Sequence, residues 1–487
     1  MLNVQCSMLN AQCSMNKKVL ISLIPVVVLI VVLAITIHVF GSSALNGASQ
    51  TALIAVAGLC CFIAMTYFKV SWKALEEGIK ETVSNASIAV VILLLIGAIS
   101  GTWILSGVVP LLIYYGLQVI SPSFFLVCTC LICSLVSVMT GSSWTTIATI
   151  GIALLGIGQA QGFSEGLIAG AIISGAYFGD KMSPLSDTTV LASSMTDVPL
   201  FSHIRYLVYT VLPTMIITLV VFTVLGLEHP VTDAGEINLY VQTLEQKFNL
   251  TPWLLVVPLL TGLMIARRLP ALIVLFLSTL IAAIAALFFQ PHILLEVAGA
   301  DAPRGLELFT GMIKSIYGET QIETGVTAIN DLVSTSGMAG MLGTVWLIIS
   351  AMTFGACMTT SGMLHHITSL LVPLCKRRAS MVATTVGTGA LLNTMLADQY
   401  LSIILTGNMF KRVYKEQGYE SRLLSRSIED SCTVTSPLIP WSSCGMTQAT
   451  ILGVPTLTYL PFCFFNLISP LMSILVALIG YKIFQKK

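Results

Sequence analysis

Charged side chains are scarce in this sequence of 487 residues: Asp, Glu, Lys and Arg make up 9% of it, against 56% hydrophobic residues. Soluble domains carry roughly a quarter charged residues, so the composition excludes an ordinary soluble protein. The mean hydropathy of +0.92 agrees and indicates a polytopic membrane protein. The formal net charge of +1 also excludes the strongly basic surface of a nucleic-acid-binding protein.

The twelve cysteines do not form a disulfide framework. Several lie inside apolar runs, where a small buried thiol is the expected state. Cys128 and Cys133 imitate a metal-binding spacing, but we interpret them as packing residues of a membrane helix. No cofactor is therefore expected.

Apolar runs of about 17–25 residues, long enough to cross a bilayer, recur along the chain. Lysine and arginine clusters in short connections mark the cytoplasmic side, and they predict that both termini lie in the cytoplasm. We expect a cytoplasmic N-terminus (1–18), a first repeat (19–227), an external linker (228–251) and a second repeat (252–487). The protein is expected in the cytoplasmic membrane, in contact with lipid.

Each repeat is expected to contain five spans, one re-entrant hairpin and one broken helix. The first hairpin tip is predicted at Thr140–Thr146, and the second near Thr388–Thr394 and Asp398. The broken stretches are predicted at 165–200 and 427–454.

Matching features suggest a duplication. Asp180 and Asp430 are 250 residues apart (430 minus 180), and Gly141 and Gly389 are 248 apart (389 minus 141). Five crossings is an odd number, so the second repeat would be inverted relative to the first. Inverted repeats with discontinuous helices are typical of secondary transporters. The predicted fold class is all-α, with two inverted-topology repeats.

The segment 170–195 carries charges where lipid is expected. Gly179, Asp180, Lys181, Pro184 and Asp187 fall within nine residues. A charge at the bilayer centre costs at least about 2.5–3.5 kcal/mol, and glycine and proline interrupt the helical hydrogen bonds that lipid demands. These side chains should therefore face protein, water or an ion.

Broken helices expose carbonyl and hydroxyl oxygens, which suit a small hard cation, and a nearby carboxylate can hold either that cation or a proton. The predicted ion- and proton-binding residues are Asp180, Asp187, Asp398, Asp430, Ser142, Ser143, Thr188 and Thr394, with Na⁺ at Asp180 and Asp187. The predicted supporting residues are Thr145, Ser183, Ser186, Asn393, Glu429 and Ser436. No catalytic residue is expected.

Lys181 is interpreted as a counter-ion that pairs with Asp180 or Asp187. The alternatives are that it holds an empty site or attracts an anion. No other buried lysine or arginine is expected. Glu429 and Asp430 follow Arg426 closely, so a solvated helix start is an alternative interpretation of that pair.

The segment from Gly179 to Thr189, GDKMSPLSDTT, resembles the signature of NhaC-type sodium/proton antiporters in the ion transporter superfamily, and GSSWTT at 141–146 resembles the hairpin of that family. The layout is similar over nearly the whole chain. Val190 stands where many members carry asparagine, which removes one potential oxygen ligand. The resemblance implies exchange of Na⁺ for H⁺, and the same family includes malate/lactate antiporters.

The leading hypothesis is therefore a transporter, not an enzyme, that exchanges Na⁺ or Li⁺ for H⁺ by alternating access. The alternative is a Na⁺- and H⁺-coupled exchanger of small organic anions, malate for lactate. An intramembrane aspartyl protease is disfavoured because Tyr177 lies two residues before the Gly-Asp pair, where that class needs glycine. A channel is disfavoured because its filter loops are oligomeric. A homodimer is the expected assembly.

Overall fold

The computed structural model describes residues 2–40, 47–85, 87–228, 234–267, 269–299, 302–375 and 377–481. Within these ranges the regular elements are helices, and the one extended pairing is an antiparallel bridge between Thr320 and Thr335. By length and composition, seven of the described helices can cross a membrane, or ten if each of three bent pairs is one span. The chain is therefore an all-α polytopic membrane protein, as the composition predicts.

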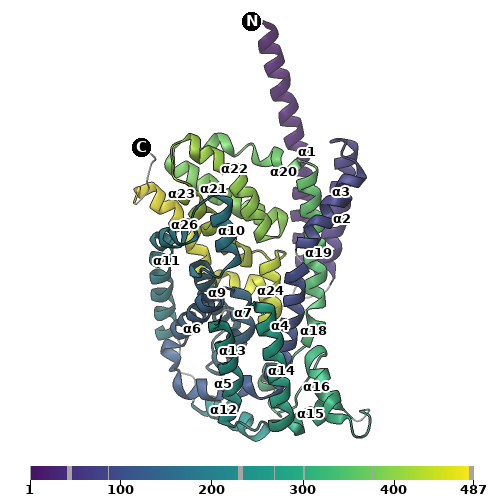
Figure 1. The fold of residues 1–487 in the computed structure, drawn as a ribbon, viewed down its shortest axis with the longest axis vertical. Coiled ribbons are helices and arrows are strands. Elements are labelled where there is room, and N and C mark those ends of the chain that lie inside the picture. The colour runs from purple at the N-terminus through teal and green to yellow at the C-terminus, as the bar shows by residue number, and fades with distance from the viewer. Residues whose placement is uncertain are drawn as a thin grey trace.

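The first half contains two outer helices, a charged amphipathic helix, a bent helix pair, a helical hairpin and a broken helix (Figure 1). In chain order its elements are α1 (Leu2–Phe40), α2 (Ala48–Thr66), α3 (Trp72–Asn85), α4 (Ser87–Leu105), α5 (Val108–Val119), η2 (Pro122–Phe124), α6 (Phe125–Thr140), α7 (Ser143–Thr146), η3 (Ile147–Gly151), α8 (Ile152–Ala160), α9 (Glu165–Met182), α10 (Asp187–Met195) and α11 (Leu200–Glu228).

The second half begins with extra short helices and then repeats the order of hairpin, broken helix and final span. Its elements are α12 (Ala234–Lys247), η4 (Pro252–Leu255), α13 (Val256–Ala266), α14 (Ala271–Phe289), α15 (Pro291–Ala298), α16 (Glu307–Tyr317), α17 (Thr327–Leu332), α18 (Gly337–Gly340), α19 (Leu342–Thr360), α20 (Met363–Thr368), η5 (Val372–Leu374), α21 (Arg378–Leu396), α22 (Gln399–Glu416), α23 (Ser421–Ile428), η6 (Glu429–Thr433), η7 (Ser436–Leu438), α24 (Ser443–Leu452), α25 (Thr456–Tyr459), η8 (Leu460–Phe462) and α26 (Phe464–Ile479).

The predicted bend in the long third apolar run is confirmed. The axes of α4 and α5 differ by 66°, and Gly107 lies between them with a φ of 84° that favours glycine. The acidic segment 228–250 differs from the loop expected there, because it contains α12. Leu244 and Phe248 are buried in the main core, so helical spacing of apolar residues outweighs the acidic composition.

Small residues let α9 lie directly against α6. A β-carbon at Gly175 would come within 2.9 Å of the backbone carbon of Cys130, and one at Gly179 within 2.7 Å of the backbone nitrogen of Val138. In a membrane, such close approach is a main source of helix association. The two glycines therefore fix the depth at which α9 presents Asp180.

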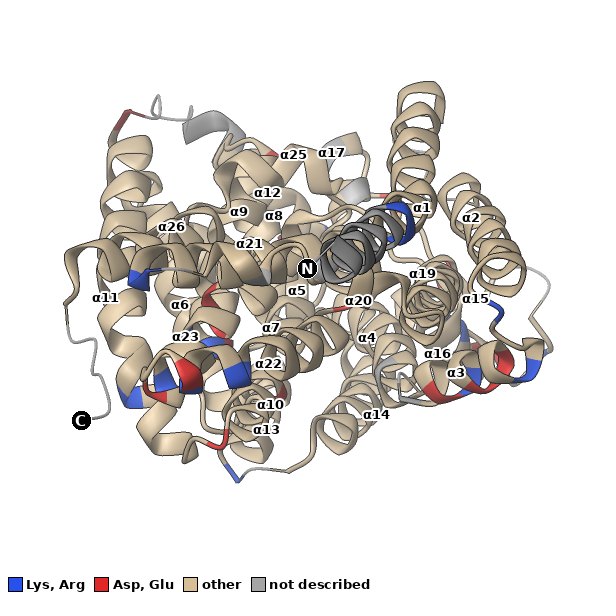
Figure 2. Ribbon diagram, turned by 90° about the horizontal axis from the view of Figure 1, so that it is seen from above, with Lys and Arg blue, Asp and Glu red and all other residues tan. Residues whose placement is uncertain are grey.

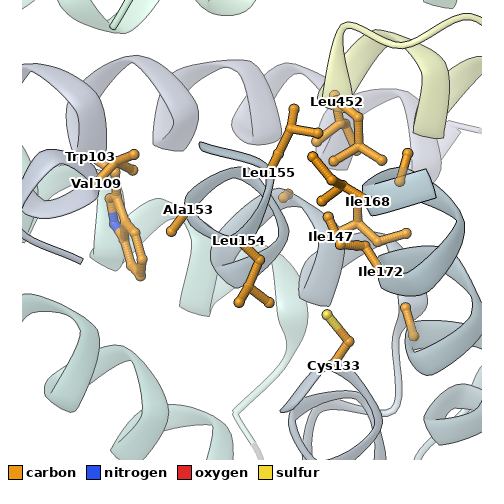
Figure 3. Packing of buried hydrophobic residues seen from close by; sticks show 14 of the residues in the cluster. Trp103, Val109, Cys133, Ile147, Ala153, Leu154, Leu155, Ile168, Ile172 and Leu452 are labelled. Atoms are coloured by element: carbon orange, nitrogen blue, oxygen red, sulfur yellow. The ribbon is translucent and has the colours of Figure 1, made fainter. Parts of the chain in front are cut away.

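The core around η3 joins the hairpin to its neighbours. Figure 3 shows Ile147 of η3 beside Ile168 and Ile172 of α9, with Leu452 of α24 close to them. The three isoleucines are fully buried. This packing holds the hairpin, α9 and α24 in fixed relative positions.

Most lysine and arginine residues of the described helices lie at one end of the molecule. Figure 2 looks onto this end and shows charged residues along α22, α23 and α3. Figure 1 shows α21, α22 and α23 at the upper end and α5, α12, α15 and α16 at the lower end. The upper end also carries the start of α1 and the end of α26.

The two hairpins turn in the same way at an offset of 256 residues. Gly141 and Ala397 (397 minus 141) both adopt the left-handed conformation, with φ of 69° and 55°. The next residues, Ser142 and Asp398, cap the following helices by accepting a backbone N–H three residues later.

The two broken helices follow the same offset. Ser186 caps α10 and Ser442 caps α24 (442 minus 186). Side chains that tie each hairpin to its broken helix also correspond: Ser137 Oγ donates to the Ala176 carbonyl at 2.6 Å, and Asn393 Nδ2 donates to the Cys432 carbonyl at 2.5 Å. The hydrogen bonding around both interruptions is therefore duplicated within the chain.

This register differs from the one expected from sequence. Gly389 lies inside α21, not at the turn, which is formed by Ala397 and Asp398. The structural counterpart of Asp180 is Ser436, not Asp430 (436 minus 180). The sequence comparison was misled because Ser-Pro-Leu recurs at 183 and 436, an offset of 253, although the backbone turns recur at 256.

Candidate ion-binding site

A cavity of about 820 Å³ lies where the first hairpin, the first broken helix and the start of α22 meet. Six predicted site residues line it, and they are Ser142, Ser143, Thr145, Asp180, Asp187 and Thr188. Gln399 and Tyr400 line the cavity from the second half. The structure thus brings together most of the polar residues that the sequence predicts in the first repeat.

The hairpin tip is shaped by the turn at Gly141. Its φ of 69° favours glycine, and a β-carbon there would lie 2.6 Å from the Leu185 backbone. Ser142 then caps α7: its hydroxyl accepts the Thr145 N–H at 3.2 Å and the Thr145 hydroxyl at 3.1 Å. The tip therefore lies directly against the break between α9 and α10.

Asp180 is the buried carboxylate of this cavity, with 5% of its surface exposed. One of its oxygens, Oδ2, accepts the Ser143 hydroxyl at 2.7 Å and the Ser143 N–H at 3.3 Å. Hydrogen bonds from a hydroxyl and a helix N-terminus stabilise a negative charge. None of the ion pairs found in the described residues includes Asp180.

The break after α9 supplies further oxygens. Ser186 caps α10, and its hydroxyl lies 3.0 Å from that of Thr188. Asp187 follows at the first position of α10 and is exposed along the cavity wall. Ser183 faces away from the cavity, because its hydroxyl donates to the Val138 carbonyl at 2.8 Å and so closes the turn.

Asp398 lies at the matching turn of the second hairpin and is 3% exposed. It caps α22 by accepting the Leu401 N–H at 2.9 Å, and Ser443 donates to its other oxygen at 3.4 Å. The residues directly after it, Gln399 and Tyr400, reach the cavity wall.

Asp430 lies in a separate buried cluster of charges. Its Oδ1 forms an ion pair with Lys181 and accepts the hydroxyls of Thr210 and Ser469, each at 3.2 Å. Lys181 and Asp430 are both fully buried. The expected pairing of Lys181 with Asp180 or Asp187 is therefore wrong, since consecutive side chains on a helix point in different directions.

Arg426 contradicts the expectation that Lys181 is the sole buried cation. It is fully buried, lies 3.9 Å from Asp430 Oδ2 and packs over the Tyr206 ring at 4.8 Å. Glu429 is also fully buried, and neither of its carboxylate oxygens has a hydrogen-bond partner among the described residues. The alternative of a solvated helix start is therefore wrong for Glu429 and Asp430.

The remaining predicted residues lie outside the cavity lining. The Thr394 hydroxyl donates to the Ala390 carbonyl within α21, and the Asn393 amide ties α21 to the second broken helix. Ser436 is fully buried. Gln399 and Tyr400 were not predicted, although their position directly after a capping aspartate was a signal that could have identified them.

The sequence profile of the Na⁺/H⁺ antiporter family matches residues 175–481. The chain is 36% identical over 425 residues to the Na⁺/H⁺ antiporter NhaC of Alkalihalophilus pseudofirmus. This alignment covers 87% of this chain and 89% of the relative. It is 37% identical over 419 residues to the malate-2H⁺/Na⁺-lactate antiporter of Bacillus subtilis, covering 86% of each chain.

A relative with a different cargo is also similar. The arginine/ornithine antiporter ArcD of Halobacterium salinarum is 31% identical over 476 residues, covering 96% of this chain and 93% of the relative. The profile match extends over more than half of the chain and includes Asp180, Asp187, Asp398 and Asp430. By this match and by the relatives that align over most of its length, the chain belongs to the Na⁺/H⁺ antiporter family.

Proposed function

We propose that this protein exchanges Na⁺ for H⁺ across the cytoplasmic membrane. One observation carries the proposal: the cavity wall holds two carboxylates, Asp180 and Asp187, and its described lining contains no lysine, arginine or histidine. Such a wall attracts cations and offers an anion no charged partner. The hydroxyls of Ser142, Ser143 and Thr188 supply the hard oxygen ligands that a small cation requires.

Exchange follows from competition for Asp180. A protonated carboxylate has no negative charge with which to bind Na⁺. Binding of Na⁺ therefore releases the proton, and binding of the proton releases Na⁺. Ser143 positions the carboxylate through its hydroxyl and N–H, and Asp187 adds negative charge at the mouth. Li⁺ carries the same charge and prefers the same oxygen ligands, so it is a second cargo of this site.

Organic-anion exchange is the second candidate, since one similar protein is a malate/lactate antiporter. Lys181 and Arg426 are buried cations of the kind that an organic anion would need as partners. Both lie outside the cavity lining, and Lys181 is paired with Asp430. The charge arrangement therefore favours Na⁺ over malate or lactate.

A second cavity supports an alternating-access mechanism. Its volume is about 330 Å³, and it is lined by parts of α4 and α8, by residues 334–337 and 450–453, and by Leu332, Gly340 and Met341. The hairpin arm α7–η3–α8 runs from the first cavity at Thr145 to the second at Ile152, about 10 Å at a helical rise of 1.5 Å per residue. Movement of this arm would open the site to either end in turn.

The duplicated turns support two repeats, 19–227 and 252–487, and the proposal takes them as inverted. The end that carries α3, α22, α23 and the start of α1 would be cytoplasmic, because lysine and arginine gather there (Figure 2). The first 18 residues would then be cytoplasmic and 228–251 external. We further propose a homodimer in the lipid bilayer.

Reconstituted vesicles with an internal pH dye test the proposal. An inward Na⁺ or Li⁺ pulse is expected to drive proton efflux, and Asp180→Asn is expected to abolish it. Asp197→Asn is the matched control, because Asp197 is an exposed residue whose carboxylate pairs with Lys411. Proton movement driven by malate, lactate or ornithine, but not by Na⁺, would refute the proposal.

A further inference from the structure

The duplicated turns give Asp180 and Asp398 related surroundings. In the first half, Ser142 caps the hairpin helix α7, and the next residue, Ser143, donates a hydrogen bond to Asp180. In the second half, the equivalent positions are Ser436 and Gln399 (436 minus 180, 399 minus 143). The first half carries its carboxylate on the broken helix, at Asp180. The second half has Ser436 at that position and carries its carboxylate at the helix cap, at Asp398.

We propose that the second turn is a further cation site, built from Asp398, Gln399, Ser436 and Ser443. This inference rests on the proposed function in assigning Na⁺ as the cation. It goes beyond that function in assigning two separate Na⁺ ions to each chain, one at Asp180 and one at Asp398.

Unpartnered oxygens at this turn point to a bound ion. Gln399 Oε1 and Ser436 Oγ have no hydrogen-bond partner among the described residues, although the two side chains are 3% and 0% exposed. A buried oxygen without a partner is unfavourable, because it has lost its hydrogen bonds to water. A cation bound at this turn would be a partner for these oxygens, because side-chain carbonyl and hydroxyl oxygens are ligands that a hard cation accepts.

The charge of Asp398 is also uncompensated. This carboxylate is 3% exposed and takes part in none of the ion pairs of the described residues. Its hydrogen bonds come from the backbone N–H groups of Tyr400 and Leu401 and from the Ser443 hydroxyl, which are all neutral groups. A monovalent cation would balance the charge.

The backbone at the turn can add two further oxygen ligands. Of the last four carbonyl groups of α21, that of Asn393 accepts the Ala397 N–H and that of Thr394 accepts the Trp441 indole N–H, each at 2.9 Å, so those of Met395 and Leu396 are the candidates. Ala397 directs its own carbonyl to the Ser443 N–H at 2.8 Å, which holds the ends of α21 and α24 together. The turn therefore has the donor chemistry of a hard-cation site and a fixed backbone.

An ion can reach this turn from the cavity that contains the first site. Gln399 lies on the cavity wall, as do Asp180 and Asp187. Two cations in one cavity repel each other, but the three carboxylates supply one more negative charge than two Na⁺ ions require. Occupation of both sites is therefore compatible with the local charge.

Binding of ²²Na⁺ to the purified full-length protein tests this inference. At saturation we expect two ions per chain for the wild type, and one for both Asp398→Asn and Asp180→Asn. Asp197→Asn, the exposed control, should retain two. One ion per chain in the wild type, or two in Asp398→Asn, would overturn the second site.

A second pair of variants covers the case in which Asp398→Asn does not fold, since this aspartate also caps α22. Gln399→Ala and Ser443→Ala leave the cap intact and are expected to weaken one of the two binding events at least fivefold. Unchanged affinities in both variants would refute the site. Na⁺-driven proton flux with a single bound ion would refute the second site alone, whereas absence of both flux and Na⁺ binding would refute the proposed function.

Discussion

Removal of either partner of the Lys181–Asp430 ion pair should destabilise the protein, and by unequal amounts. Both side chains are fully buried. Loss of one partner from a buried pair costs about 3–5 kcal/mol, because the other charge remains without compensation. Lys181→Met still leaves Asp430 with Arg426 at 3.9 Å, so we expect a cost near 3 kcal/mol.

Asp430→Asn should be the more damaging change. It leaves Lys181 and Arg426 buried together, with Glu429 as the remaining carboxylate of the cluster, and we expect a cost near 5 kcal/mol. The double variant Lys181→Met, Asp430→Asn removes one charge of each sign. It should cost less than the sum of the two single changes, because the cluster regains its balance.

The thermal midpoint of the detergent-solubilised protein measures these effects, with a fixed heating rate because membrane proteins usually unfold irreversibly. We expect Asp430→Asn to have the lowest midpoint, Lys181→Met a higher one, and the double variant at least that of Asp430→Asn. Glu76→Gln, which removes an exposed pair with Lys80, should leave the midpoint unchanged. An Asp430→Asn midpoint equal to or above that of Lys181→Met would refute this account of the cluster.

Four further outcomes follow from the structure. Ser143→Ala removes the hydroxyl that donates a hydrogen bond to Asp180. Loss of this hydrogen bond should weaken Na⁺ binding by about 1 kcal/mol, so the KM for Na⁺ in vesicle exchange should rise about fivefold. Because Na⁺ and H⁺ compete for one carboxylate, that KM should rise by up to tenfold per unit fall in pH, and a KM independent of pH between 6 and 9 would contradict the competition. Gly179→Leu should prevent folding, as seen by gel filtration, whereas Gly262→Ala, with no atom within 4 Å of the new carbon, should not. Copper phenanthroline should join Cys61 to Cys357, whose sulfur atoms lie 3.1 Å apart, and peptide mass spectrometry should detect the bond.

Local sequence signals predicted most of the polar residues that line the cavity from the first half. The charges after an apolar run indicated the break that ends α9, and the hydroxyl-rich segment 140–146 indicated the hairpin tip. Both depend on neighbouring residues: glycine permits the left-handed turn at Gly141, and serine caps the helix after it. The second hairpin was placed too early because Ala397, which is not a usual turn residue, adopts that conformation.

Contacts between residues far apart in the chain could not be predicted from local sequence patterns. Lys181 meets Asp430, which is 249 residues away, although two aspartates lie much nearer in sequence. Arg426 resembled part of a solvated basic segment, because it lies close to Lys415 and Arg422 in the sequence. Its burial depends on Tyr206, which belongs to the first half, and no local pattern reports that contact.

The adjacency of Asp180 and Lys181 gives α9 a specific role in the proposed exchange. One residue faces the cavity and the next pairs with Asp430 on the second broken helix. The Thr189 hydroxyl lies within 3.4 Å of the carbonyl oxygens of both residues, so α10 is fixed to the same point. Any movement of Asp180 when a cation binds must therefore move the ion pair, or α10, or both. This mechanical link connects the proposed cation site of the first half to the broken helix of the second half through the backbone of α9.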